Sequence, residues 1–240
     1  MYSLVDVGLY SMLNYNLSKS FRISFGARAD LNVLRSSSYT FIATPRMAMI
    51  YHRPRFSVKF TSGSGYQGVS QSARFSSAFG RTANENIEPE KIDYADLSIG
   101  GGIRARGSAE GPSPFEYDLS GYVCKITDAV GVDSTVIGTR TVFKNANIGQ
   151  YRILGALGSL AWQPSKYFRL DANGTYTLAV QTDSTAARVG KAPRLLVGDI
   201  ARFMANLSAN LILNDLGPVH LSLNLRANYV STRPLSLIHI

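Results

Sequence analysis

Apolar and polar residues alternate along this chain over unusually long segments. In the clearest segment, Phe168 to Gln181, apolar or small residues at every second position oppose polar residues, and only Ala179 interrupts the polar row. Successive side chains of a β-strand point to opposite faces, so this segment predicts a strand with one apolar and one polar face. It is 14 residues long, whereas strands of soluble proteins usually have about 5–6 residues and about 9–11 tilted residues cross a bilayer. The pattern therefore favours a transmembrane strand.

The same alternation predicts about ten strands in the whole chain. They are expected at Leu4–Leu17, Phe21–Val33, Tyr39–Tyr51, Arg55–Tyr66, Ile92–Arg104, from Phe115 onward, Tyr151–Trp162, Phe168–Gln181, Phe203–Leu211 and Leu221–Tyr229. The faces of Tyr151–Trp162 cannot be assigned from its less regular pattern, and no stretch shows a 3.6-residue apolar period. The predicted fold class is all-β: an antiparallel transmembrane β-barrel, present in part as about ten strands of a larger barrel.

The predicted connections alternate between short and long. The long ones are Gln67–Lys91, Lys125–Gly149 and Asp183–Ala201. Outer-membrane barrels have short periplasmic turns and long external loops. With the short turns in the periplasm, both chain ends would lie at the external rim, whereas complete bacterial barrels normally keep both ends in the periplasm. We therefore expect a fragment, with residues 1–233 as a partial barrel and residues 234–240 as a non-native tail.

Composition agrees with a barrel and argues against other classes. The chain is 45% hydrophobic and 17% charged, with 13 Tyr and 11 Phe, and has no apolar run of the length that a membrane helix needs. The net charge of +9 comes from singly scattered basic residues, which does not favour a nucleic-acid partner. Cys124 is the only cysteine, so an intramolecular disulfide and a multi-cysteine metal site are excluded.

Two glycine-rich stretches have structural explanations. Gly63–Gly68 matches G-x-G-x-x-G, but the dinucleotide-binding motif requires a helix after the glycines, and Val69–Ser77 shows no helical period. We interpret the match as a glycine-rich strand end. Gly100–Gly102 would let the barrel bend or let another backbone approach closely, and we favour the bend.

A catalytic site does not emerge from the sequence. The histidines are His52 in a predicted periplasmic turn, His220 at the start of the last strand and His239 in the tail. No set of serine, histidine and acid can be placed together by position. We expect no enzyme, no cofactor and no metal site, and individual ligand-contact residues cannot be named.

Several motifs resemble those of TonB-dependent outer-membrane receptors. In that family a strand ends in a G-x-G-aromatic segment, as Lys59–Tyr66 does here. An N-P-x-L-x-P-E segment then leads into the next strand, as Asn84–Lys91 does, although Glu85 replaces the first proline. Thr44–Arg46 resembles the family's P-R strand. Tyr151–Trp162 resembles its G-x-E hairpin, but lacks the expected acid. The resemblance spans most of residues 39–234.

The resemblance implies the C-terminal part of a barrel that imports a scarce nutrient such as a metal chelate, a vitamin or a glycan. It also implies a location in the bacterial outer membrane, with the lipid bilayer, a small nutrient ligand and a TonB-type energy-coupling protein as partners. The last of these would act through a missing N-terminal region. Ligand contacts are expected from the three long loops. The alternatives are a passive porin-like channel, a barrel hydrolase that uses His220, and a soluble β-sandwich binding module.

The assigned faces also predict the effect of two substitutions. Leu170→Arg should disrupt membrane folding because a lipid-facing arginine near the midplane costs roughly 2–4 kcal/mol. Thr175→Arg should be tolerated because Thr175 belongs to the polar row.

Overall fold

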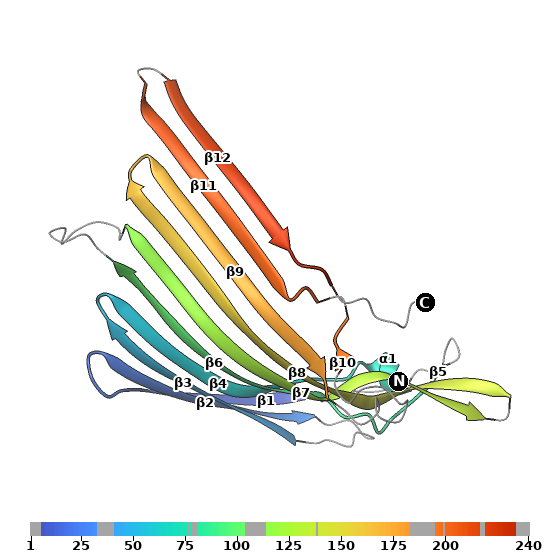
Figure 1. Cartoon of the computed structure of the whole chain (residues 1–240). Coiled ribbons are helices and arrows are strands. Elements are labelled where there is room, and N and C mark those ends of the chain that lie inside the picture. The colour runs from blue at the N-terminus through green and yellow to red at the C-terminus, as the bar shows by residue number, and fades with distance from the viewer. Residues whose placement is uncertain are drawn as a thin grey trace.

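The fold is one curved, open, antiparallel sheet (Figure 1). The computed structural model describes residues 6–32, 41–75, 77, 81–103, 114–137, 139–182, 195–198, 200–216 and 219–233. The ten main strands follow one another in the sheet in chain order. They are β1 (Asp6–Asn16), β2 (Phe21–Asn32), β3 (Phe41–Arg53), β4 (Phe56–Gln67), β6 (Glu90–Ile103), β7 (Phe115–Ile137), β8 (Arg140–Ser165), β9 (Phe168–Gln181), β11 (Phe203–Leu216) and β12 (Val219–Val230).

Three short elements complete the described part. They are α1 (Gln71–Phe75), β5 (Arg81–Thr82), which pairs with β8, and β10 (Leu195–Leu196), which pairs with β9. The all-β prediction and its ten main strands are confirmed. Among the described residues, no helix has the length and apolar character needed to cross a membrane.

The strand register carries one apolar and one polar face across the sheet. One row of directly opposed residues on the apolar face is Val58, Ile99, Leu119, Gly158, Gly174, Ala205 and Tyr229. The adjacent row on the polar face is Ser57, Gly100, Asp118, Ser159, Asn173, Asn206 and Asn228. The register also settles the β8 segment whose faces the sequence left open, because it places Trp162 and Leu154 on the apolar face.

Among the described residues, no second layer of protein covers the apolar face. Buried hydrophobic side chains among the described residues are limited to Ile87, Ala129, Ala179 and Ala201. On the apolar face, by contrast, Leu9 is 74% exposed. A β-sandwich requires two sheets packed face to face, so the sandwich alternative is wrong.

Aromatic residues lie at both ends of the apolar face. Ring pairs near the short turns are Tyr51–Phe56 at 5.8 Å, Phe115–Tyr117 at 6.5 Å and Trp162–Phe168 at 5.9 Å between centroids. Near the other end, the rings of Phe203 and Tyr229 are 6.0 Å apart. Aromatic rings at two levels, with aliphatic residues between them, are typical of strands that cross a bilayer.

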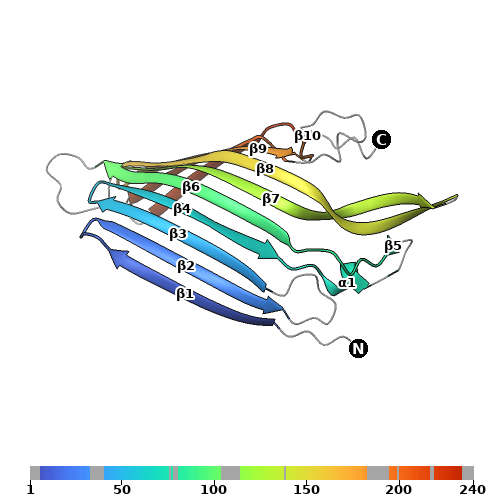
Figure 2. The same cartoon turned by 90° about the horizontal axis from the view of Figure 1, so that it is seen from below.

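The predicted loop Lys125–Gly149 is wrong, because this segment is a long β-hairpin. β7 runs to Ile137 and β8 starts at Arg140, so both strands extend far beyond their neighbours (Figures 1 and 2). Register shifts around Ala129 hide the alternation from a simple period-2 count. A bulge adds a residue to one strand without ending the pairing.

The interpretation of Gly63–Gly68 as a glycine-rich strand end is confirmed, because β4 ends at Gln67, but one detail of each glycine-rich stretch needs correction. A five-residue helix, α1, begins three residues after Gly68, although the sequence shows no helical period there. No βαβ unit surrounds it, since β4 and β6 pair antiparallel. At Gly101, a side-chain Cβ would lie 2.4 Å from the carbonyl oxygen of Arg55. Close approach of the turn backbone therefore requires glycine at this position.

Candidate functional site

The connection between β4 and β6 contacts the extended hairpin. We call this connection, residues 68–89, the strap, and the part of β7 and β8 between Ala129 and Gly149 the outer hairpin. The strap leaves β4 and returns to β6, yet its β5 segment pairs in parallel with β8 at Phe143 and Lys144. In the main sheet β7 lies between β6 and β8, so β5 pairs with a strand that is not the ladder neighbour of β4 or β6. Figure 2 shows α1 and β5 beside the outer hairpin.

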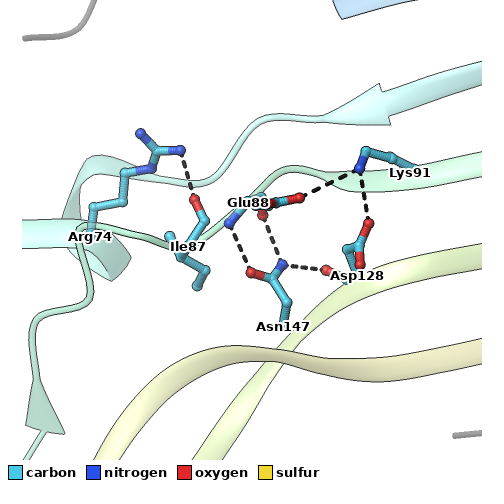
Figure 3. Close-up of polar contacts among 6 residues, drawn as sticks. All are labelled: Arg74, Ile87, Glu88, Lys91, Asp128 and Asn147. Atoms are coloured by element: carbon cyan, nitrogen blue, oxygen red, sulfur yellow. Dashed lines mark hydrogen bonds and ion pairs between the residues drawn. The ribbon is translucent and has the colours of Figure 1, made fainter. Parts of the chain in front are cut away.

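The strap has a small buried centre of its own. Ile87 is completely buried, and Arg74 and Pro89 are each less than 2% exposed. Nη2 of Arg74 donates a hydrogen bond of 2.8 Å to the carbonyl oxygen of Ile87, which ties α1 to the returning half of the strap (Figure 3). Burial of a guanidinium is costly without such partners, so this contact fixes how the strap folds back.

Asn147 on the outer hairpin joins the strap to the β7 bulge. Its Oδ1 accepts a hydrogen bond of 2.8 Å from the backbone N–H of Glu88, and its Nδ2 donates to the Glu88 carbonyl at 2.9 Å. The same Nδ2 donates to the carbonyl of Asp128 at 2.6 Å (Figure 3). The side chain of Asn147 thus provides hydrogen-bond partners for three backbone groups, two in the strap and one in the β7 bulge, which have no partner in a strand ladder.

Two more asparagines and a threonine make further contacts between strap and hairpin. Nδ2 of Asn84 donates to the carbonyl of Asn145 at 2.7 Å, and Nδ2 of Asn145 donates to the carbonyl of Ala73 at 3.3 Å. Oγ1 of Thr82 donates to the carbonyl of Phe143 at 3.3 Å. The strap is therefore held along its described length by side-chain to backbone hydrogen bonds.

Charged residues surround the point where the strap enters β6. Nζ of Lys91 lies 3.1 Å from Oδ2 of Asp128 and 3.5 Å from Oε2 of Glu88. The hydrogen bond to Asp128 raises the pKa of Lys91, and the negative charges of Asp128 and Glu88 add to this effect. Lys91 is the second residue of β6 and lies beyond the aliphatic part of the apolar face. Asp128 has a positive φ of 58°, a conformation that aspartate tolerates better than most residues. Oε1 of Glu90 accepts the backbone N–H of Val130 at 2.6 Å.

A small hollow lies at the base of the strap. It has a volume of about 220 Å³ and is lined by Gln67, Gly68, Val69, Ser70, Ala73, Glu90 and Val130. Glu90 is its one ionisable lining residue. The hollow is bounded by both the strap and the outer hairpin, so any movement between them would change its shape.

The polar face carries a hydrogen-bonded lining. Arg28 pairs with Asp30 at 2.8 Å, and Arg169 pairs with Asp171 at 2.8 Å. Cross-strand contacts join Arg22 to Asn16, Ser24 to Asn14, Asn206 to Asn173 and Asn224 to Asn210. A hollow of about 560 Å³ near the short turns includes Glu116, Asp118, Arg169 and Asp171 among its lining residues. Such a surface suits an aqueous interior.

Of the three histidines considered for catalysis, His52 and His220 have a described backbone, and they belong to strands that are not neighbours in the sheet. His52 is near the end of β3 and His220 is near the start of β12, which forms an edge of the sheet. The side chain of His220, and all of His239, lie outside the described residues. Within the described ranges, no three His, Cys, Asp or Glu side chains are grouped so that they could hold a metal ion. The parts of the predicted loop Asp183–Ala201 at 183–194 and 199 also lie outside the described residues, as does the predicted tail 234–240.

Solved structures share this fold. The sheet is similar to a mutant of the ferric enterobactin receptor from Pseudomonas aeruginosa, with a TM-score of 0.70 and 13% identity over 96% of this chain and 33% of that one. The FrpB iron transporter from Neisseria meningitidis is similar with a TM-score of 0.67 and 12% identity, over 96% of this chain and 34% of that one. The copper transporter OprC is similar with a TM-score of 0.64 and 13% identity, over 87% of this chain and 32% of that one. The chain thus spans about a third of each of these proteins.

Sequence comparison identifies the family. No curated protein matches the sequence. Residues 2–236 match the family described as TonB dependent receptor-like, beta-barrel. The motifs noted in the sequence, the ten-stranded sheet and this match agree. The chain therefore belongs to the TonB-dependent receptor-like β-barrel family.

Proposed function

We propose that this chain forms part of the barrel of an outer-membrane receptor that imports a scarce nutrient with energy supplied by a TonB-type protein. The barrel would be completed by strands that pair with β1 and β12, because an open edge in a bilayer leaves backbone groups without partners. Its apolar face would contact lipid and its polar face would line the interior. The nutrient would be a metal chelate, a vitamin or a glycan.

One observation carries the location in a membrane. Ten long strands present a continuous apolar face with exposed side chains such as Leu119, 57% exposed, and Leu225, 70% exposed. Soluble proteins rarely expose apolar surface on this scale. The opposite face carries charged and amide side chains paired across strands, which supports a hydrated interior.

We infer that ligand contacts come from the strap and the outer hairpin. β1 begins and β12 ends at the same end of the sheet as these segments (Figure 1). With the short turns in the periplasm, strap and hairpin face the outside. They project beyond the sheet and enclose the hollow beside Glu90, so a ligand arriving from outside would meet them first.

Uptake measurements test the proposal. The complete protein that contains this chain would be produced in a bacterial host without its own receptors, and uptake of radiolabelled ferric and cupric chelates, a cobalamin and oligosaccharides would be measured. We expect saturable uptake of one ligand that disappears in a host without its TonB-type protein. Ligand-independent insertion into outer membranes, measured by heat-dependent gel mobility, would establish the barrel separately.

The passive channel predicts a different result. Uptake through a porin-like barrel would rise linearly with solute concentration and would not depend on the energy-coupling protein. A barrel hydrolase would instead release product from an ester or peptide substrate and lose activity on His220→Ala. Either result would contradict the receptor proposal while leaving the barrel itself intact.

A further inference from the structure

The apolar face contains a hollow that the transport function does not use. Its volume is about 610 Å³, and it lies across β2, β3, β4, β6 and β7. Phe25, Met47 and Val123 form its sides, and Ser62, Ser64 and Ala95 are among the small side chains between them. Most lining residues on β4, β6 and β7 belong to the apolar face by register, and only Gly63 and Tyr94 belong to the polar row between them. The hollow is therefore open to the surface that we assign to lipid.

Small side chains create the hollow. Elsewhere on this face the corresponding positions hold large residues, such as Leu97 and Ile99 on β6. Oγ of Ser62 donates a hydrogen bond of 3.1 Å to the carbonyl of Tyr94, so its hydroxyl is satisfied within the sheet. The floor can accept hydrocarbon without leaving this polar group unpaired.

One end of the hollow carries charge on the same face. Register places Ser64, Asp93, Lys125 and Arg152 in one row across neighbouring strands. Lys125 and Arg152 are direct cross-strand neighbours, and like charges in this position destabilise a sheet. Within the described part of the chain, neither forms an ion pair within 4 Å, and both are exposed. This row lies next to the β7 bulge, at the end of the sheet where the strap and outer hairpin project.

We propose that this hollow binds an acyl chain of a phosphorylated lipid in the outer leaflet, with the lipid phosphate between Lys125 and Arg152. A phosphate between the two cations would relieve their repulsion, and a guanidinium matches phosphate oxygens through paired hydrogen bonds. The negative charge of Asp93 offsets one of the positive charges of Lys125 and Arg152. The row therefore keeps one net positive charge, which a single anionic group would neutralise. The proposal rests on the membrane location and orientation given above.

Retention of lipid through purification tests the assignment. The complete protein would be extracted in mild detergent, exchanged into nanodiscs with lipid A or with lipid A whose phosphates have been removed, and examined by native mass spectrometry after release. We expect one tightly held lipid A per protein. Retention should fall by about tenfold or more for the dephosphorylated lipid, because the charge-assisted bonds are lost.

Two variants separate the charged end from the hollow. Lys125→Gln combined with Arg152→Gln should reduce retention of lipid A to that of the dephosphorylated form. Ala95→Trp should displace the acyl chain while remaining compatible with a lipid-facing position. Arg53→Gln is the matched control, because Arg53 is a cation near the short turns, outside the hollow, and it should retain lipid A fully.

Heat-dependent gel mobility would verify that each variant is a folded barrel. We call the double glutamine variant and Ala95→Trp the cavity variants, and either of them alone suffices for the test. Equal retention by the wild type and both cavity variants would overturn the proposal. So would retention of a second copy of the protein in the hollow, detected as a dimer that Ala95→Trp abolishes. A protein that is water-soluble without detergent would instead contradict the membrane location on which the proposal rests.

Discussion

The membrane-spanning sheet and the strap are stabilised by different interactions. In the sheet, residues such as Leu9 and Leu225 are largely exposed, and cohesion comes from the backbone ladder. In the strap, Ile87 and Pro89 are buried, and asparagine side chains satisfy backbone groups. The sheet uses the bilayer as its apolar environment, whereas the strap builds a small protein interior outside the bilayer. Equivalent substitutions should therefore have different effects in the two regions.

The largest expected effect is at the centre of the strap. Ile87→Ala removes a fully buried side chain, which typically costs about 2–5 kcal/mol. Hydrogen exchange of the strap amides in the complete protein should become much faster. Ile99→Ala, at a site 40% exposed on the apolar face, is the control and should leave strap exchange unchanged. Equal acceleration by both variants would remove the distinction between the regions.

The next largest effect concerns the two faces of the sheet. Leu119 and Ser120 are consecutive residues of β7 on opposite faces. Leu119→Arg should lower the free energy of unfolding by roughly 2–4 kcal/mol, because it places a charge in the bilayer interior. Ser120→Arg should be tolerated on the polar face. Refolding titrations into lipid vesicles would measure both, and equal losses would contradict the face assignment.

A moderate effect is expected where the strap meets the hairpin. Asn147→Ala removes three hydrogen bonds to backbone groups, each worth roughly 0.5–1.5 kcal/mol. Limited proteolysis should then cut the strap faster, while cleavage at the short turns stays constant. Lys144→Ala, at an exposed neighbouring position on the hairpin, should not change the cleavage rate. A strap that resists protease equally in both variants would show that Asn147 does not hold it.

The smallest effect should come from the exposed ion pair. A double-mutant cycle of Lys91→Met and Asp128→Asn would measure its coupling in strap hydrogen exchange, and we expect about 0–1 kcal/mol. Asparagine also tolerates the positive φ at position 128. Since Asp128 raises the pKa of Lys91, any stabilisation should persist at neutral pH and be lost as the pH rises through the range where Lys91 deprotonates. A coupling that increases in strong alkali would contradict this sign.

Depth along the strands was harder to predict than the choice of face. The sequence places Leu170 correctly on the apolar row but near the midplane. In the structure Leu170 lies directly opposite Trp162, whose ring contacts Phe168 beside the turn. A charge near the interface costs only about 0–1 kcal/mol, so Leu119 is the better site for the arginine test. Alternation defines the face, whereas depth depends on where neighbouring strands end.

The outer hairpin had a sequence signal that the period-2 count missed. Val-, Thr- and Ile-rich segments flank Gly138-Thr139, and a glycine at the first of two turn positions is typical of a tight hairpin. The register shifts around Ala129 separate this pattern from the regular part of β7. Local β-propensity could therefore have corrected the loop prediction, but alternation alone could not.

Sequence alone determined the faces of the regularly alternating strands and pointed to the family, because the side-chain period of a strand is written directly into residue order. The faces of β8 and the full lengths of β7 and β8 came from the strand register. Only the tertiary structure showed that the strap pairs with β8, and that Ser64, Asp93, Lys125 and Arg152 form one row. These neighbours come from separate strands. Their proximity depends on the register of several ladders at once, and a shift of one residue in any ladder would have separated them.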